Sequence, residues 1–382
     1  SALRTKHDVS HITWTRRYDP YGMAQDQSLK SDLEATGVTV TSLNGSLLWE
    51  PWDVRKPDQT PYRVFTPFYK RGCAAAPLPR PPKTAPKIEC AAIDWATDDA
   101  LSQLIPRINW HPEVLSGWQP GEQGASKALQ TFQDRALQGY KKGRDFPALQ
   151  STSRLSPHLH FGELSPNQIW HAISELPTTE DSAHFKSELA WREFSYHLLY
   201  RHADLDSKNL NPKFDPFPWR DAPDDLKRWQ QGQTGIPIVD AGMRELWHTG
   251  WMHNRCRMIV ASFLTKDLII DWRWGEKYFM QTLVDGDLAA NNGGWQWSAS
   301  SGMDPKPLRI FNPYTQAQKF DPEADYIRHW LPELSGLDTQ VLLTGQIPRL
   351  LCQQHDYPEP IVEHRVRQRE FKRLYKLVKD KA

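Results

Sequence analysis

A proline-rich segment divides this chain and limits the folds open to it more than any other feature does. The run is Pro77-Leu-Pro-Arg-Pro-Pro-Lys-Thr-Ala-Pro86. Proline has no amide donor and a fixed φ, so this run cannot form the interior of a helix. We expect a stiff, extended linker over residues 76–98, because proline-rich segments favour extended conformations. A domain boundary therefore falls there, between residues 1–75 and residues 99–382.

Residues 1–75 have the pattern of a β-α-β unit. Short apolar, β-branched runs at His11–Trp14 and Gly37–Thr41 predict strands, and the polar stretch Gln25–Ala35 between them is compatible with a helix. Two strands cannot form a free-standing parallel sheet. We therefore interpret this part as the end of an α/β domain whose beginning is absent from the chain.

Residues 99–382 are predicted to be all helical. The segments with apolar residues three and four positions apart are Ala125–Tyr140, Pro166–Leu176, Ala183–Tyr200, Pro237–Thr249 and Trp251–Leu268. Ser165 supplies a capping hydroxyl before the first-turn proline Pro166, and Gly250 supplies a helix stop. The basic, weakly amphipathic stretch Ile361–Ala382 predicts a solvated terminal helix.

Composition excludes several classes of protein. The 47 Lys and Arg nearly balance the 46 Asp and Glu, so any affinity for nucleic acid must come from a local basic surface. The 4 cysteines are far apart without a CxxC pair, which argues against a disulfide framework or a zinc module. No apolar run reaches the roughly 20 residues of a membrane span, and the N-terminus lacks the apolar core of a signal peptide. We expect a soluble, intracellular protein.

Tryptophan is in surplus, with 17 in the chain, concentrated between Trp170 and Trp330. A large helical core filled with indoles explains this surplus as well as a functional role does. The position of each Trp has to decide between the two interpretations.

Two segments carry polar side chains at spacings that suit ligand binding. Tyr140 and the loop Thr152–Ser156 combine hydroxyls, backbone amides and an arginine, which can surround a pyrophosphate or simply close a turn. On a helix, Glu188, Trp191 and Arg192 occupy positions i, i+3 and i+4 and share one face. That face suits a polar aromatic ligand, and it equally suits a salt-bridged helix with its indole in the core.

A third segment, Trp251–Met258, places Asn254 and Met258 one helical turn apart. Its arginines, Arg255 and Arg257, either contact phosphates or pair with internal acids.

Elsewhere, the pair His158-Leu-His160 lacks a third ligand at a suitable spacing and is interpreted as structural. The sequence also has no nucleophile elbow, Walker loop or GxGxxG motif, which disfavours hydrolases and dinucleotide dehydrogenases.

The fourth segment, Asp285–Trp297, sets two acids and two asparagines beside paired glycines. A calcium loop of the EF-hand type would need an oxygen ligand at Ala289, a glycine at Ala290 and a carboxylate at Gln296, so calcium is excluded. Glycines that allow close backbone approach, together with amides and carboxylates, fit the edge of an organic cofactor better. We expect no metal.

In this order, the segments resemble the FAD-binding helical domain of the DNA photolyase/cryptochrome family, specifically its class I cyclobutane pyrimidine dimer photolyases. The runs that carry the resemblance are TSRLS, ELAWREF, GWMHNRCRMI, DWRWGEKYF and DGDLAANNGGWQW. The resemblance extends from about Trp14 to Glu363. It implies the fold class α/β plus all-α, in which the C-terminal part of a Rossmann-like antenna domain is linked to a large, all-helical FAD-binding catalytic domain.

The resemblance also implies a set of cofactor-binding residues. Those around the FAD phosphates and ribose are Tyr140, Thr152, Ser153, Arg154, Leu155, Ser156 and Arg192. Asp285 and Asp287 would lie on the flavin or its ribitol, with Arg257 paired to Asp285. Asn291 would face the flavin N5 and adjust to its redox state through an amide that both accepts and donates.

The implied reaction is light-driven repair of cyclobutane pyrimidine dimers in UV-damaged DNA, a carbon–carbon lyase reaction. Excited, reduced FAD would pass an electron to a dimer flipped out of the duplex, and the electron would return after the ring opens. The residues matching the dimer pocket are Glu188, Trp191, Asn254, Met258 and Trp297, with Glu188 as hydrogen-bond or proton donor. Positions near the DNA backbone are Arg144, Arg255 and Arg309. The indoles matching the electron-transfer chain to the flavin are Trp219, Trp272 and Trp295.

Several alternatives remain at this point. A cryptochrome photoreceptor is disfavoured because plant cryptochromes carry Asp at Asn291 and because no long C-terminal extension follows. A (6-4) photoproduct enzyme would carry His at Asn254 and Met258, and a passive DNA-binding flavoprotein would not remove dimers in light. Tyr21 and Gly22 replace an Asn-Glu pair of folate-binding relatives, so methenyltetrahydrofolate is disfavoured and a deazaflavin antenna stays open. We expect a monomer in the cytoplasm or at the nucleoid, with no membrane partner.

Overall fold

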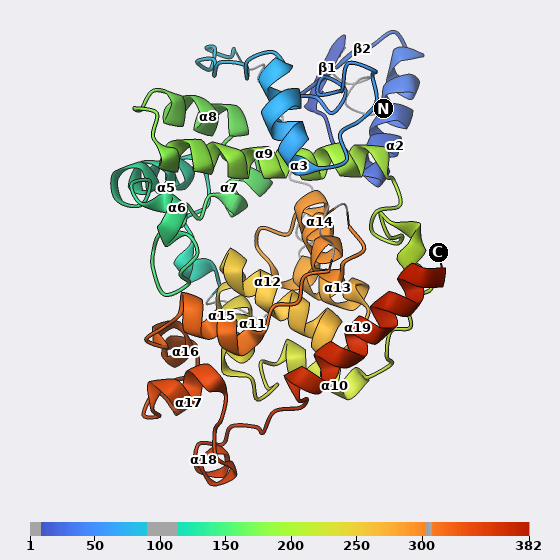
Figure 1. The fold of residues 1–382 in the computed structure, drawn as a ribbon. Helices are drawn as coiled ribbons and strands as arrows, with labels where there is room; N and C mark the ends of the chain where they lie inside the picture. The colour runs from blue at the N-terminus through green and yellow to red at the C-terminus, as the bar shows by residue number, and fades with distance from the viewer. Residues whose placement is uncertain (1–8, 90–113, 303, 305–307, 382) are drawn as a thin grey trace, which may run out of the picture.

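The computed structural model describes residues 9–89, 114–302, 304 and 308–381. Within these ranges the chain forms one small sheet and many helices (Figure 1). The first elements are β1 (His11–Thr15), α2 (Pro20–Glu34), β2 (Thr39–Leu43), α3 (Phe65–Pro67) and the π-helix η1 (Phe68–Cys73). The elements after the linker are η2 (Val114–Gly117), α5 (Glu122–Arg135), α6 (Tyr140–Gly143), α7 (Ser156–His160), α8 (Pro166–Ser174), α9 (Glu180–Arg201), η3 (Pro212–Phe214), α10 (Pro223–Gln230), α11 (Pro237–Thr249), α12 (Asn254–Ser262), the π-helix η4 (Phe263–Asp267), α13 (Trp272–Thr282), α14 (Leu288–Ala299), α15 (Pro313–Phe320), α16 (Asp325–Trp330), η5 (Pro332–Leu334), α17 (Thr339–Thr344), α18 (Arg349–Gln354) and α19 (His364–Lys381).

The N-terminal part is a β-α-β unit, as predicted. Strands β1 and β2 pair in parallel, with Ile12 opposite Val40. Helix α2 begins five residues before the predicted Gln25, because Asp19 caps it by accepting the amide of Gly22 and a proline occupies its first turn. Strand β2 begins two residues later than predicted, since Gly37 has a φ of 85° and lies in the preceding turn.

The proline-rich segment has no regular secondary structure over the residues that the structure describes. Residues 77–89 form neither helix nor strand, whereas residues 90–98 of the predicted linker, with Cys90, and the start of the predicted helical part at residue 99 lie outside the described residues. The carbonyl of Pro77 accepts from Trp49 Nε1 at 2.7 Å, and the carbonyl of Pro79 lies 2.9 Å from His171 Nε2. The segment therefore contacts both parts of the chain.

Local signals set most helix boundaries after the linker. Ser165 caps α8 in a capping box with Gln168, and α11 ends at Gly250, which has a φ of 64°. The predicted single helix Ala125–Tyr140 is wrong, because Gly139 has a φ of 82° and separates α5 from α6. The predicted helix from Trp251 starts only at α12, where the ring of His253 accepts the amide of Arg255.

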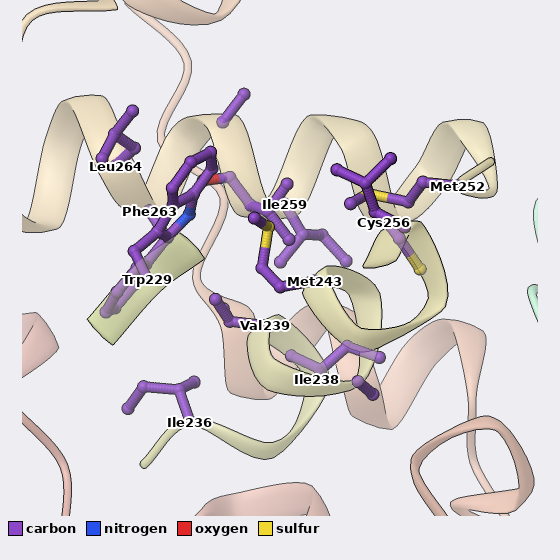
Figure 2. Close-up of a cluster of buried hydrophobic side chains, with 14 of the residues drawn as sticks. Trp229, Ile236, Ile238, Val239, Met243, Met252, Cys256, Ile259, Phe263 and Leu264 are labelled. Carbon is purple, nitrogen blue, oxygen red and sulfur yellow. The ribbon is translucent and has the colours of Figure 1, made fainter. Parts of the chain in front are cut away.

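Buried apolar side chains form two large clusters in the described residues. One lies between α10, α11, α12 and α13, and Figure 2 shows Trp229, Met243 and Ile259 within it. The other joins the N-terminal part to α9: Trp49 and Phe68 pack with Leu189 and other side chains of that helix. In Figure 1, α9 crosses the molecule directly beneath the blue N-terminal elements. The two parts of the chain therefore share a core at α9.

Over the described ranges, no helix is both long enough and apolar enough to cross a bilayer.

Candidate functional site

Helix α9 carries the first group of predicted site residues. The carboxylate of Glu188 accepts from Arg144 Nη1 at 2.5 Å, and His184 Nε2 lies 3.6 Å from the same carboxylate oxygen. The Arg144 guanidinium also lies 5.7 Å from the centre of the Tyr140 ring, which is buried. The structure thus brings Tyr140 and Arg144, at the two ends of α6, together with Glu188 on α9.

Arg192, one residue beyond Trp191, is held by the N-terminal part. Its Nη1 donates to the carbonyl of Ser46 at 2.7 Å, and its guanidinium lies 4.8 Å from the centre of the Tyr196 ring. Trp191 itself is 42% exposed on the adjacent face of α9. The two residues therefore differ in setting: Arg192 is tied to the neighbouring part, and Trp191 is open to a ligand.

Glu193 is a buried acid that the sequence reasoning missed. Its Oε2 accepts from the amides of Leu48 at 2.9 Å and Trp49 at 3.4 Å, and its Oε1 lies 3.4 Å from Arg192. Burial raises the pKa of Glu193 to about 7, while the nearby arginine and amides act in the opposite direction. The sequence gives no local sign of this role for Glu193, because the amides that it accepts belong to residues about 145 positions earlier in the chain.

The predicted phosphate loop adopts an unusual backbone. Arg154 has a φ of 51°, a left-handed conformation that is uncommon for a non-glycine residue. Its guanidinium lies 4.6 Å from the ring centre of Trp118 and 4.8 Å from that of Trp251. Leu155 is buried, and Ser156 begins α7. The loop therefore presents Thr152, Ser153 and a cation beside the start of a short helix.

A second acidic and basic group lies at α12 and the start of α14. Arg257 Nη2 donates to both carboxylate oxygens of Asp285, at 3.1 and 2.9 Å, which confirms the predicted pairing. Asp285 is buried, and Arg257 also donates to the carbonyl of Met252 at 2.8 Å. Asp287 caps α14 through the amide of Ala290 and accepts the hydroxyl of Tyr196 on α9. These bonds fix α12, α14 and α9 relative to one another.

Glu245 is another buried acid without a sequence signal. Its Oε2 accepts from the Tyr326 hydroxyl at 2.7 Å and from the amide of His253 at 2.9 Å. Burial raises the pKa of Glu245, and the nearby Arg154 and Arg257 oppose that rise. This carboxylate supports the start of α12 and faces the cations of two predicted cofactor segments.

Asn291 lies on α14, and the nitrogen of its side-chain amide already donates hydrogen bonds. Its Nδ2 donates to the backbone carbonyl of Glu276 at 3.0 Å and to the side chain of Glu276 at 3.1 Å. These bonds orient the amide and leave its oxygen as an acceptor for a ligand. Glu276 is thus a supporting residue that the sequence reasoning did not single out.

The three indoles of the predicted electron-transfer chain have different surroundings. Trp295 is buried edge-on against Phe279, with 5.0 Å between ring centres, and Trp272 is buried with its Nε1 donating to Asn209. Trp219 is only partly buried and packs on Phe217 at 4.4 Å. Among the described residues, no direct ring contact joins these three indoles to one another. Trp295 and Trp272 are thus both buried, whereas Trp219 is partly exposed.

The remaining predicted substrate residues lie on α12 and α14 and in the following loop. Asn254 Nδ2 is 3.8 Å from Met258 Sδ, so both side chains share the exposed start of α12. Trp297 packs on Phe311 at 5.9 Å and lies under the guanidinium of Arg309 at 5.3 Å. Arg309 pairs with Asp304, and Arg255 pairs with Asp145. The arginines predicted near DNA therefore already have acidic partners.

The donors of this site fit an FAD molecule. Arg154 is exposed, lies against the rings of Trp118 and Trp251, and makes no hydrogen bond to a carboxylate within the described part of the chain. An accessible cation beside two hydroxyl residues suits a phosphate. Gly294 on α14 has nothing within 4 Å of an added Cβ, which leaves room for a flat ring against the helix. In the described ranges, no group of three or more His, Cys, Asp or Glu side chains could hold a metal ion.

These features define an FAD-binding protein with an α/β part ahead of a helical part. A family model described as the FAD-binding domain of DNA photolyase matches residues 185–377, and one described as DNA photolyase matches residues 1–87. The chain belongs to the DNA photolyase/cryptochrome family, and it carries that family's FAD-binding domain.

Comparisons with individual proteins agree with this family. The chain is 47% identical over 367 residues to the deoxyribodipyrimidine photo-lyase of Agrobacterium fabrum, covering 92% of this chain and 76% of the relative. It is 37% identical to Arabidopsis thaliana Cryptochrome-1, of which it covers 50%. The structure of a class III photolyase from Agrobacterium tumefaciens matches with a TM-score of 0.90 at 44% identity, over 99% of this chain and 81% of that one. Membership of class I, which the motifs predicted, gains no support from this match.

Proposed function

We propose that the protein repairs cyclobutane pyrimidine dimers in UV-damaged DNA with the energy of light. The main observation behind this proposal is one face of α9. On that face the partly exposed indole of Trp191 lies one helical turn after Glu188 and its carboxylate. Enzymes that act on a base flipped from the duplex combine flat stacking surfaces with a few polar groups in this way. Relatives named deoxyribodipyrimidine photo-lyase, at 35% to 47% identity, support the same reaction.

Bound FAD would supply the electron that opens the cyclobutane ring in light and would take it back, so no net oxidation or reduction occurs. The protein would hold this cofactor through the loop Thr152–Ser156, with Arg154 near its phosphates. Arg192, Asp287 and the Arg257–Asp285 pair would fix the other groups of the cofactor. Asn291 would offer its amide oxygen to the ring edge.

The dimer would lie between the indoles of Trp191 and Trp297, with Asn254 and Met258 beside it. Glu188 can donate a hydrogen bond only from a protonated carboxyl, yet it accepts from Arg144 at 2.5 Å. Arg144 therefore competes with the dimer for Glu188 and must release that carboxyl when the dimer enters. Release would leave Arg144 free to meet a DNA phosphate.

The other DNA-backbone residues face the same competition. Arg255 is paired with Asp145 at 2.6 Å and Arg309 with Asp304 at 3.0 Å. Arg309 is the more exposed of the two, so we propose it as the main phosphate contact. We also propose that the protein acts on DNA as a monomer, which size-exclusion chromatography with and without a dimer-containing oligonucleotide would test.

For photoreduction of the cofactor, we propose the path Trp295, Trp272 and Trp219. It runs from a fully buried indole to a half-buried one near the surface. Replacing Trp219 by Phe should slow light-driven reduction of oxidised FAD without changing repair by protein that is already chemically reduced. Equal photoreduction rates in the variant and the wild type would contradict this path.

Illumination of the reduced protein with a thymine-dimer oligonucleotide tests the main proposal. Absorbance near the thymine band should recover only with both light and enzyme. The double variant Glu188→Ala with Trp191→Ala should abolish recovery, whereas Trp274→Ala removes another exposed indole, on α13, and should leave it unchanged. Bound, photoreducible FAD without any recovery would instead make the chain a photoreceptor of the cryptochrome type.

A further inference from the structure

The indole of Trp191 rests on a ring from the N-terminal part of the chain. The ring of Phe65 is stacked on it with 3.6 Å between centres and 10° between planes. Phe194 meets the same indole nearly at right angles, at 6.0 Å and 78°. Phe65 therefore covers one face of the indole, and Trp191 as a whole remains 42% exposed.

Phe65 is itself fixed by its neighbours. It is stacked on Tyr69 at 5.8 Å and 10°, so Trp191, Phe65 and Tyr69 form a column of three parallel rings. Phe65 begins α3, and the π-helix η1 that follows buries Phe68 against Phe194 at 5.2 Å. The backbone that carries Phe65 is thus anchored in the core shared with α9.

The position of α9 relative to this column is fixed by independent contacts. Glu193 accepts the amides of Leu48 and Trp49, and Arg192 donates to the carbonyl of Ser46. These bonds hold the residues next to Trp191 against the N-terminal part. The stack is therefore a built contact between two well-anchored elements and not a meeting of two mobile side chains.

A parallel ring behind an indole restricts its rotation, because any other rotamer gives up the stacking contact. Less ordering is then needed when a second flat ring stacks on the free face, which strengthens binding. We propose that Phe65 is a positioning residue for substrate: it holds Trp191 with one face presented to the flipped pyrimidine dimer. This inference rests on the proposed function of the α9 face.

Trp297, the other indole proposed to flank the dimer, has a looser support. Its nearest ring, Phe311, lies at 5.9 Å and is tilted by 36°, and an arginine lies over the indole at 5.3 Å. The Trp191 side would thus be the rigid wall of the pocket and the Trp297 side the adjustable one. Only the rigid wall is built from both parts of the chain.

A double-mutant cycle in the dark tests the proposal without any light reaction. The wild type, Phe65→Ala, Trp191→Ala and the double variant are loaded with FAD, and their affinity for a thymine-dimer oligonucleotide is measured by fluorescence anisotropy. Phe65→Ala should weaken binding about three- to tenfold, the range that an aromatic pair contributes. In the Trp191→Ala background it should have no further effect, because Phe65 acts through that indole.

Further variants separate positioning from folding. Phe65→Tyr keeps the flat ring and should bind within about twofold of the wild type, whereas Phe65→Leu keeps much of the volume without the stack and should resemble Phe65→Ala. Phe161→Ala removes an exposed ring elsewhere and should change nothing. FAD content and thermal unfolding are recorded for each, and if Phe65→Ala folds poorly the cycle is run with Phe65→Leu.

The outcomes separate this inference from the function on which it rests. Wild-type affinity in Phe65→Leu, or an equal loss in both Trp191 backgrounds, would overturn the positioning role while leaving repair intact. A wild type that binds FAD but does not prefer the dimer oligonucleotide over undamaged DNA would overturn the proposed function itself.

Discussion

The N-terminal sheet and the helical part of the molecule are stabilised in different ways. The two strands of the sheet bury one residue, Val40 in β2, and their other side chains are half-buried or exposed. Helix α11, by contrast, buries most of its residues in one continuous core. A two-stranded sheet with so little burial is marginal by itself. The comparison indicates that the N-terminal part depends on α9, and that α9 depends on it for the geometry of the site.

The division into residues 1–75, a linker over 76–98 and a helical part over 99–382 stays a proposal about sequence organisation. The core shared by Trp49, Phe68 and Leu189 crosses that division. We therefore expect the two parts to unfold together, and the following variants test how tightly they are coupled.

The largest effect should come from Glu193→Ala. The change leaves the amides of Leu48 and Trp49 without their acceptor and leaves Arg192 without its buried anion. Breaking a buried ion pair by removing one partner costs about 3–5 kcal/mol in the free energy of unfolding. Urea unfolding followed by tryptophan fluorescence, with FAD content as a second readout, would measure it.

Glu34→Ala is the control for this variant, because Glu34 pairs with Lys30 on the exposed surface of α2 and should matter by less than about 1 kcal/mol. If both variants were equally stable, the contact between α9 and the N-terminal part would contribute nothing.

The second-largest effect should appear in the pH dependence of the free energy of unfolding. Because burial raises the pKa of Glu193 from 4.5 to about 7, the native state binds more protons than the unfolded state between those values. The contribution of Glu193 to the free energy of unfolding is then fully present below about pH 4.5 and is lost as pH rises to about 7. Glu193→Gln cannot titrate, so the difference between wild type and variant should change by about 3 kcal/mol across this window.

His197, one turn further along α9, has the opposite behaviour, since burial lowers its pKa to about 4. That contribution is present in both proteins and cancels in the difference. A difference that is independent of pH between 4.5 and 7 would contradict the buried, titrating Glu193.

An overpacking variant addresses the helical part alone. A Cβ added at Gly275 would lie 2.2 Å from the Trp295 ring, so Gly275→Ala should destabilise the protein by about 2 kcal/mol. Gly336→Ala is the control, because nothing lies within 4 Å of its added Cβ. Thermal unfolding of the two variants checks this, and no difference between them would mean that the Trp295 pocket can relax.

The smallest effects should come from the same deletion in the two regions. Val260→Ala in the helical core should cost about 1.5 kcal/mol and Val40→Ala in β2 about 1 kcal/mol, because the sheet site can collapse more easily. Both should shift a single unfolding transition if the two regions unfold together. Two separate transitions in the Val40 variant would show that the sheet unfolds independently.

Local sequence signals predicted much of this architecture correctly. Ser165 and Gly250 set helix ends through capping and a left-handed backbone, which depend only on near neighbours. The helix Pro237–Thr249 and the strand at His11 follow from apolar periodicity for the same reason. The start of α2 at Pro20 could also have been predicted, because Asp19 is a typical helix cap. The apolar periodicity alone placed the start of the helix too late.

Only the tertiary structure decided how the site is supported. Nothing in the sequence singles out Phe65 or Glu193. Their partners Trp191 and Leu48 lie more than a hundred residues away, and sequence patterns relate only near neighbours. The motif around Trp191 determined which side chains are available on α9. Packing against the N-terminal part decided which of them are buried, which carry a shifted pKa and which stay open to a ligand, since burial and desolvation are properties of the folded chain.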